Sequence, residues 1–377
     1  MAKEFKIHNK SDKPDNIIIK ENAIIEQCEE IQGELPKFLR GFFMYLKGNV
    51  LPMSRLAYLR DLKFFFTYLI NESGLTSAKD IQDISVDEMN KIKARDVNYY
   101  LDYLRRYKVE KENGIYIYEN DNKSLARKRS SVSVMFKYLY RDEMIEKNIT
   151  DGFDPIKLPK AGDKEIKALR DDEVMIMLDT VSTGEGLTKK EKQFWQKTKL
   201  RDKAMLILFI TYGLRLSELQ QLNVTSFNFG RGEFKIYRKR GKEAVMPINK
   251  STIQVIDDYL KNERPTYEKK GESPVDSDAL FLSMQGNRMT ERQIRQMVKK
   301  YTSIALGTSR DSGYSPHKLR ATTATSLIER GHSIYDVQAL LSHDNITTTQ
   351  LYAAHKKNAT RDLVNDLEWE TEFDDID

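Results

Sequence analysis

Two arginines, two histidines and one tyrosine follow one another in a fixed order in the C-terminal part of the chain. They lie in three segments: TYGLRLSEL with Arg215, SPHKLRATTAT with His317 and Arg320, and LLSHDNITTTQLY with His343 and Tyr352. Two guanidiniums can bind a phosphate through paired hydrogen bonds, imidazoles can orient it and move protons, and a phenol can attack phosphorus. The ordered set therefore supplies the groups needed to break and rejoin a DNA phosphodiester without a metal or a nucleotide.

The segment around His317 predicts an anion site at the start of a helix. Ser315 is a good N-cap and Pro316 fits the first helical position, so His317 falls in the first turn, where free backbone N–H groups favour an anion. Arg320, three residues later, lies on the same helix face. The alternative is an ordinary capped helix that carries a surface histidine.

The settings of Arg215 and Tyr352 are less specific. One alternative makes Arg215 a surface arginine paired with Glu218, three residues on, although Gly213 just before it would let the backbone approach a ligand. Tyr352 is one of 19 tyrosines in the chain, and most tyrosines serve in packing. The functional prediction therefore depends on the combination of residues.

Composition excludes several other kinds of site. The chain has one cysteine, Cys28, so no internal disulfide can form, and the metal and nucleotide motifs CxxC, HExxH and GxxxxGK are absent. We therefore predict no metal and no cofactor. No stretch approaches the roughly 20 apolar residues of a membrane span, and the N-terminus lacks an apolar signal core. These features predict a cytoplasmic protein without a membrane partner.

The distribution of charge permits a nucleic-acid partner. The 377 residues carry a formal net charge of +5, yet eight acids and one base fall between Arg361 and Asp377, so the remainder is more basic than the total. Basic residues near Ser124 and in the Pro/Gly-containing stretch after Thr150 are expected to contact phosphates, with a solvated helix face as the alternative. The predicted DNA contacts are Arg127, Lys128, Arg129, Lys157, Lys160 and Lys242.

Hydrophobic periodicity predicts a mainly α-helical fold with a small antiparallel β-sheet. Ser54 is the expected N-cap of a long helix, and residues 108–123 are expected to form a loop or small hairpin. The segment FNFGRGEFKIYRKRGKEAVMPI alternates as strands do. Further helices are predicted near residues 95–106, 124–140, 251–262, 291–301, 316–330 and 334–341.

The chemistry-bearing segments resemble the catalytic domain of the tyrosine recombinases, the site-specific recombinase and phage integrase family. That family combines an arginine in a GLRxSEL-like motif, a lysine on a β-hairpin, HxxR, a histidine in LLxH and a tyrosine nine residues later, and all these spacings hold here. The strand pair YRKRGKEAVMPI places the lysine at Lys239, with Lys242 as the second candidate. Ser342 and Ala321 depart from the family, which commonly has glycine and histidine there.

The resemblance covers most of residues 170–360 and implies a role for each residue. It makes Tyr352 the nucleophile that forms a 3′-phosphotyrosyl bond, and Lys239 the acid that protonates the departing 5′-oxygen. His317 would help to deprotonate the phenol, and His343 would hydrogen-bond the phosphate or position the arginines. Arg215 and Arg320 would neutralise the charge that develops on the non-bridging oxygens.

The resemblance also suggests how the chain is divided. We expect a flexible arm at 1–23, a helical core-DNA-binding domain at 24–150, an extended linker at 151–169, a catalytic domain at 170–360 and an acidic segment at 361–377. The α+β catalytic domain and the helical domain would form a two-domain clamp on duplex DNA. The acidic segment is expected to pack on a neighbouring subunit of a homotetramer, with a disordered tail as the alternative.

The implied function is site-specific DNA recombination through a Holliday junction. The helical N-terminal half and the segment KQFWQKTKLRDKA are most similar to the XerS branch. This similarity favours chromosome dimer resolution in the bacterial nucleoid, with a DNA translocase as the regulator that the resemblance suggests. The alternatives are an integrase or excisionase of a phage or conjugative element, a type IB topoisomerase, and a DNA-binding protein without activity.

Overall fold

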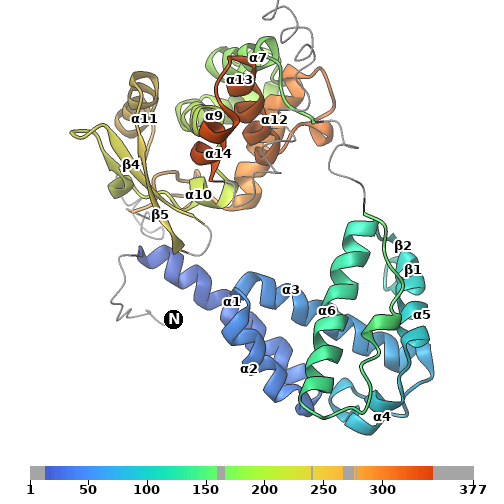
Figure 1. Ribbon diagram of the computed structural model, residues 1–377. Coiled ribbons are helices and arrows are strands. Elements are labelled where there is room, and N and C mark those ends of the chain that lie inside the picture. The colour runs from blue at the N-terminus through green and yellow to red at the C-terminus, as the bar shows by residue number, and fades with distance from the viewer. Residues whose placement is uncertain (1–12, 159–165, 239–240, 266–275, 277, 343–377) are drawn as a thin grey trace, which may run out of the picture. The chain divides into compact units, whose positions relative to one another are not determined.

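The chain divides into two compact units, Met1–Pro159 and Lys160–Asp377, which we call the N-terminal and C-terminal units (Figure 1). The computed structural model describes residues 13–158, 166–238, 241–265, 276 and 278–342. The division between the units falls inside the stretch 151–169 that the sequence predicts as a linker.

In its described residues, the N-terminal unit is helical apart from one β-hairpin. The strands β1 and β2 of this hairpin pair in antiparallel register from Arg106↔Glu119 to Lys111↔Gly114, within the stretch where a loop or hairpin was expected. The elements are α1 (Asp15–Glu34), η1 (Lys37–Leu39), α2 (Arg40–Asn49), α3 (Pro52–Tyr68), η2 (Leu69–Ser73), η3 (Ile81–Asp83), α4 (Val86–Lys91), α5 (Ala94–Arg105), β1 (Arg106–Lys111), β2 (Gly114–Glu119), α6 (Asn122–Arg141) and η4 (Thr150–Gly152).

Aromatic side chains from α3, α5 and α6 form the centre of this unit. Phe65 of α3 lies edge-to-face on Tyr100 of α5 with 5.0 Å between ring centroids, and both rings are buried. Phe136 of α6 contacts Phe153 in the same manner at 6.3 Å. Because Phe153 belongs to the stretch expected to be a linker, the first residues of that stretch pack into the N-terminal core.

Three helix starts differ from those expected. The first helix begins at Asp15, inside the segment 1–23 that was expected to be a flexible arm. Ser54 lies within α3, because Pro52, whose fixed φ suits the first turn, starts that helix two residues earlier. Helix α6 is capped by Asp121, whose carboxylate accepts a hydrogen bond from the backbone N–H of Ser124 at 2.8 Å.

The C-terminal unit combines helices with one small sheet (Figure 1). Strands β3, β4 and β5 are antiparallel in that order, with Phe227↔Phe234 and Phe234↔Met246 as partners. The elements are α7 (Asp171–Thr183), α8 (Lys189–Trp195), α9 (Lys199–Tyr212), α10 (Leu216–Gln220), η6 (Val224–Ser226), β3 (Phe227–Asn228), β4 (Glu233–Tyr237), β5 (Glu243–Pro247), α11 (Lys250–Asn262), α12 (Glu291–Ala305), η8 (Arg310–Ser312), α13 (Pro316–Glu329) and α14 (Ile334–Leu341).

The sheet is attached to the helices by its inner face. Phe234 of β4 stacks on Phe227 and meets Tyr212 of α9 edge-on, with 4.9 Å between centroids in both pairs. Helix α9 also packs against α7, α11 and α13, so it is the central element of the unit. The predicted fold class, mainly α with a small antiparallel sheet, is confirmed, and the β1–β2 hairpin of the N-terminal unit adds a second sheet.

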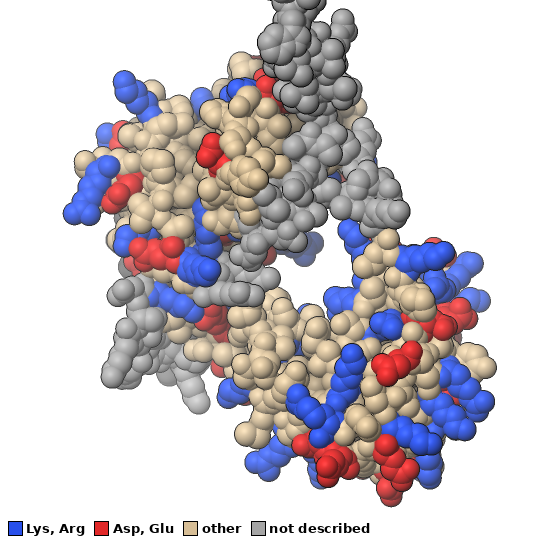
Figure 2. Space-filling view, in the orientation of Figure 1, with Lys and Arg blue, Asp and Glu red and all other residues tan. Residues whose placement is uncertain are grey.

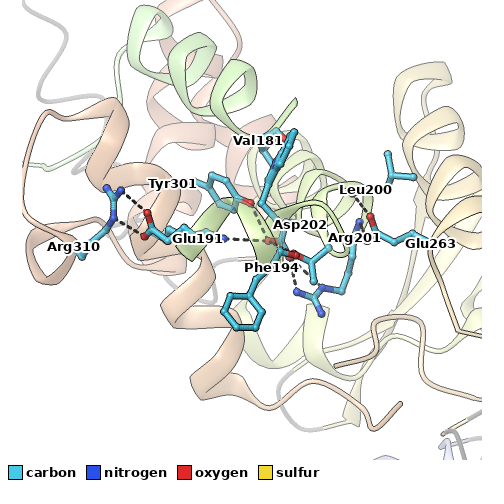
Figure 3. A network of polar contacts seen from close by, with 12 residues as sticks. Val181, Glu191, Phe194, Leu200, Arg201, Asp202, Glu263, Tyr301 and Arg310 are labelled. Atoms are coloured by element: carbon cyan, nitrogen blue, oxygen red, sulfur yellow. Dashed lines mark hydrogen bonds and ion pairs between the residues drawn. The ribbon is translucent and has the colours of Figure 1, made fainter. Parts of the chain in front are cut away.

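Buried charges fix the N-terminal end of α9 (Figure 3). Asp202, with 1 % of its surface exposed, accepts hydrogen bonds from Arg201 at 2.8 and 3.1 Å and from the Tyr301 hydroxyl of α12 at 3.0 Å. Glu263, just after α11, accepts from the backbone N–H groups of Leu200 and Arg201 at 2.8 and 2.9 Å, where the helix dipole favours an anion. These contacts set the direction of α9, whose other end carries Gly213 and Arg215.

Candidate active site

Helix α9 ends at Gly213, and this glycine has a packing role. Gly213 has a left-handed φ of +57°, and a Cβ there would collide with the side chain of Leu341 at the end of α14. In the described structure, Gly213 makes room for α14, a packing role that the sequence did not indicate. This close approach brings Arg215, two residues further on, beside the end of that helix.

Arg215 is the N-cap residue of α10 and is held by Glu218. Its backbone N–H donates to Glu218 Oε2 at 2.8 Å and its Nη1 to Oε1 at 2.7 Å, so the pairing considered for a surface arginine exists. Glu218 is only 4 % exposed, which makes this a half-buried ion pair. The remaining end of the guanidinium, Nη2, donates to the backbone carbonyl of Ser342 at 3.1 Å. Arg215 is thus oriented at two points while 35 % of its side chain stays accessible.

Helix α13 begins as the sequence predicts and brings the second arginine to the same place. Ser315 is the N-cap residue and Pro316 the first residue, so His317 lies in the first turn. Arg320, 4 % exposed, donates through Nη1 to the carbonyl of Gly213 at 2.6 Å and through Nη2 to the carbonyl of Leu341. Arg215 and Arg320 therefore converge on the segment 341–342.

His317 is uncharged at neutral pH in this setting. Burial lowers its pKa below the usual value, and the positive charges of Lys318, Arg320 and Arg215 lower the pKa further. A neutral imidazole can accept a proton, which is what a general base must do. His317 lies three residues before Arg320 on α13, so the two side chains start from the same face of that helix.

A third arginine, Arg238, reaches the same helix end and was not among the predicted residues. Its Nη2 donates to the carbonyl of Leu340 at 3.0 Å and contacts Met246 Sδ at 3.4 Å. The carbonyls of three successive residues at the end of α14 thus each accept a hydrogen bond from a different arginine: Leu340 from Arg238, Leu341 from Arg320 and Ser342 from Arg215. Such terminal carbonyls lack partners within their own helix and carry the negative end of its dipole, so cations suit them.

Three predicted catalytic residues lie outside the described residues: Lys239, His343 and Tyr352. In the sequence, Lys239 directly follows Arg238 and His343 directly follows Ser342. The structure therefore brings Arg215 and Arg320 together at the end of α14, with His317 on the same helix as Arg320, and the roles of the other three remain predictions from the motifs.

The predicted DNA contacts on α6 have partners inside the protein. Arg127 and Lys128 both bind Asp61 of α3, the latter at 3.4 Å, and Asp61 is 2 % exposed. Arg129 donates to the carbonyl of Phe153 at 3.0 Å and lies over its ring. These bonds join α6 to α3 and to the end of the unit, a structural role that the sequence did not indicate.

The other predicted contacts are freely accessible or outside the described part. Lys157 and Lys242 are exposed, and Lys160 lies outside the described residues. On the face shown in Figure 2, basic side chains of the N-terminal unit are interspersed with acidic ones. Arg127 still exposes 45 % of its side chain, so a phosphate contact and the bond to Asp61 are compatible.

Within the described ranges, no group of three or more His, Cys, Asp or Glu side chains is placed to hold a metal ion. No helix in the same ranges is both long and apolar enough to cross a membrane.

Comparison with known proteins identifies the family. Residues 167–359 match the phage integrase family. A tyrosine recombinase XerC of Natranaerobius thermophilus is 31% identical over 301 residues, covering 79% of this chain and 91% of the relative. A tyrosine recombinase XerD of Staphylococcus saprophyticus is 28% identical over 313 residues, covering 82% and 90%.

Solved structures share the fold at low identity. XerH recombinase bound to its difH substrate has a TM-score of 0.56 at 17% identity, covering 95% of this chain and 91% of that one. The Tn1549 transposon integrase in complex with circular intermediate DNA has a TM-score of 0.54 at 20% identity, covering 89% and 98%. The family match, the relative that is 31% identical and the shared fold agree with the converging arginines, and the chain belongs to the phage integrase family of tyrosine recombinases.

Proposed function

We propose that this protein cuts and rejoins double-stranded DNA at a specific site, using Tyr352 as the nucleophile and passing through a Holliday junction. The observation that carries the proposal is the convergence of Arg215 and Arg320 on the end of α14, with His317 in the first turn of the helix that carries Arg320, in a chain of the tyrosine recombinase family. The ordered motif places His343 directly after that helix end and Tyr352 nine residues later.

The two arginines would bind the scissile phosphate. Phosphoryl transfer develops charge on the non-bridging oxygens, and cations that are already oriented stabilise it without reorganisation. Arg215 is oriented by Glu218 and by the carbonyl of Ser342, and Arg320 by the carbonyls of Gly213 and Leu341. Their planar forks suit phosphate oxygens better than the ammonium of a lysine does.

Proton transfers would be divided among the remaining residues. His317, neutral at pH 7, accepts the phenolic proton of Tyr352, and the phenolate oxygen attacks phosphorus to form a 3′-phosphotyrosyl bond. Lys239 gives a proton to the departing 5′-oxygen, and His343 hydrogen-bonds the phosphate. Religation reverses these steps with a 5′-hydroxyl of the partner strand as the nucleophile.

The DNA would lie in a clamp formed by the two units, and the active assembly would be a homotetramer on two paired sites. Exposed Lys157 and Lys242 come from different units and are proposed phosphate contacts. The acidic segment 361–377 would pack on the neighbouring subunit. We further propose that the protein works in the cytoplasm on the nucleoid, with a DNA translocase as its regulator.

The favoured biological role is chromosome dimer resolution at cell division. The relatives named XerC and XerD, and the XerH recombinase solved with its difH substrate, support this role. Integration or excision of a mobile element is the second candidate, supported by the likeness in fold to the Tn1549 transposon integrase.

Covalent capture on fragmented host DNA tests the proposal. Purified protein is incubated with the DNA and denatured, and the attached fragments are sequenced, with Tyr352→Phe as the control. We expect one strongly enriched site that depends on Tyr352. A site near the replication terminus supports dimer resolution, and sites at the ends of a mobile element support integration.

Two results would contradict the proposal. Equal capture by the Tyr352→Phe variant would show that the nucleophile is assigned wrongly. Absence of capture even on a nicked version of a bound site, which traps the intermediate, would leave a DNA-binding protein without cleavage activity. Relaxation of a plasmid that lacks any captured site would indicate a topoisomerase.

A further inference from the structure

Arg238 stands at a position where the alternation of strand β4 predicts an inward-pointing apolar residue. Strand β4 alternates so that Phe234 and Ile236 point into the core and Lys235 points out. Arg238 continues the inward series by one more step, and its backbone N–H donates to the carbonyl of Lys242 at 2.8 Å. The side chain is therefore directed at the helices and away from solvent.

The contacts of Arg238 place it among the proposed catalytic arginines. Its Nη2 holds the carbonyl of Leu340, next to the carbonyl held by Arg320 and two residues from the one held by Arg215. The charges of Glu218 and Arg215 act on it electrostatically, so it lies in the same local field. Three guanidiniums thus surround one helix end.

Two nitrogens of this guanidinium are buried without a partner. Nε and Nη1 of Arg238 are shielded from solvent and have no hydrogen-bond acceptor among the described residues. A buried donor left without an acceptor destabilises the fold, and a charged donor does so more strongly. Together, these features indicate that an acceptor is supplied from outside the described part of the chain.

The local balance of charge indicates that this acceptor is an anion. Arg215, Arg238 and Arg320 are cations, and Glu218 is the acid that the described structure pairs with Arg215. Burial and the neighbouring Arg215 lower the pKa of Arg238, while Glu218 opposes this effect. A bound phosphodiester would lessen the repulsion among the arginines and satisfy the idle donors.

We propose that Arg238 is a third arginine of the active site, whose guanidinium contacts the scissile phosphate together with Arg215 and Arg320. This inference rests on the proposed function. It makes the residue directly before Lys239 a contributor to transition-state stabilisation. The competing explanation is that Arg238 only fixes the end of α14 through the carbonyl of Leu340.

The two explanations differ in how they respond to the charge of the substrate. A methylphosphonate at the scissile position replaces one non-bridging oxygen with a methyl group and removes the negative charge. An arginine that neutralises that charge is then needed less, whereas an arginine that only fixes a helix is needed equally. The captured site is made as a nicked duplex with either linkage, and the rate of covalent attachment is measured for each.

The variants are Arg238→Gln, Arg238→Lys and the control Arg231→Gln, at a solvent-exposed arginine between β3 and β4. We expect Arg238→Gln to be slower by about 100-fold on the phosphate and within about tenfold of the wild type on the methylphosphonate, with DNA affinity little changed. Arg238→Lys should restore part of the rate on the phosphate. Equal losses on both substrates, or no loss on the phosphate, would overturn the inference.

A second measurement keeps the inference separate from the proposed function. Thermal unfolding is followed in inorganic phosphate and in chloride at equal ionic strength. Phosphate should stabilise the wild type and Arg231→Gln more than Arg238→Gln. If the wild type forms no Tyr352-dependent adduct, the proposed function fails and this comparison alone decides whether Arg238 belongs to an anion site. Equal stabilisation of all three proteins would then refute it.

Discussion

At the scale of single residues, Ser342 holds the junction between α14 and the proposed catalytic His343. Its φ of +45° and ψ of +61° lie in the left-handed region, which costs a residue with a Cβ about 1–2 kcal/mol. The same residue presents its carbonyl to Arg215. The glycine that is common at this position in tyrosine recombinases would adopt this conformation without strain.

Ser342→Gly should therefore stabilise the C-terminal unit by roughly 1 kcal/mol, because the backbone conformation is kept and the Cβ is removed. The hydroxyl bond to the carbonyl of Ala339, at 3.4 Å, is too long to outweigh this gain. Chemical denaturation of the full chain measures the change. Ser342→Ala, which keeps the Cβ, is the control and should not stabilise. Equal stabilities of the glycine variant and the wild type would show that no strain is stored there.

The lowered pKa of His317 predicts how the rate of DNA cleavage varies with pH. Because its pKa is lowered from the ordinary value of about 6.5, protonation occurs only at a pH below that value. The rate of covalent attachment should be constant from pH 8 to about 6.5 and fall below it, and His317→Ala should remove this fall. The rate is measured on a nicked substrate at constant ionic strength. An inflection above pH 6.5 in the wild type would contradict the assignment.

The contacts of single residues were predicted correctly where both partners lie within a few positions of each other in the sequence. The pair Arg215–Glu218 and the N-cap Ser315 each follow from spacings of a few residues, and both are present. Arg238 was not predicted because the family motif singles out the lysines of the hairpin. Extending the alternation Phe234, Ile236 by one residue would have pointed it inward, but its contact with Leu340 joins residues far apart in sequence.

At the scale of elements, the orientation of α9 decides where the arginines meet. This helix is anchored at its start by Asp202 and Glu263 and at its end by the contact between Gly213 and Leu341. The charged network in Figure 3 is therefore a support for the site, although it lies at the other end of the helix.

Asp202→Asn should destabilise the C-terminal unit by about 3–5 kcal/mol. Asparagine keeps the shape but leaves Arg201, also buried, and Lys300, 3.5 Å from the carboxylate, without their negative partner. Urea unfolding measures the loss. Asp257→Asn is the control, because Asp257 forms an exposed pair with Lys261 worth less than about 1 kcal/mol. Equal effects of the two substitutions would show that the buried network is not a support.

The helix bounds were predicted well where the sequence signals at the helix ends are local. Helix α14 has its predicted bounds, and α13 begins at the predicted Pro316 and ends one residue before the predicted Arg330. The Ser333 side chain caps α14, whereas the start of α13 is marked by Pro316, since the Ser315 side chain makes no capping hydrogen bond. The start of α1 was missed because the polar, lysine-rich character of the residues before Asp15 was extended to residue 23, although Ile17 is buried in the helix. The bonds of Arg127 and Lys128 to Asp61 join residues more than sixty positions apart, which local patterns do not indicate.

At the scale of the whole molecule, each unit has its own buried core, and the proposed clamp requires both to touch one duplex. Sequence composition could indicate a basic chain, but it could not separate lysines free to bind phosphate from those bound to acids. The structure makes that separation for the described residues. Lys157 and Lys242 are exposed, whereas Lys128 is largely covered and bound to Asp61.

The salt dependence of DNA binding tests the clamp. The logarithm of the binding constant falls linearly with the logarithm of salt concentration, by about 0.9 per phosphate contact. Lys157→Gln and Lys242→Gln should each reduce this slope by about 1, and the double variant by about 2, because one duplex contacts both units. The control is Lys261→Gln, which should leave the slope unchanged because the charge of Lys261 is already paired with Asp257.

A second control is Lys128→Gln, which should mainly lower stability, since it removes a cation from buried Asp61. A slope that responds to the substitution in only one unit would mean that the other does not hold the DNA backbone at that lysine, and an unchanged slope in both would refute these contacts of the proposed clamp.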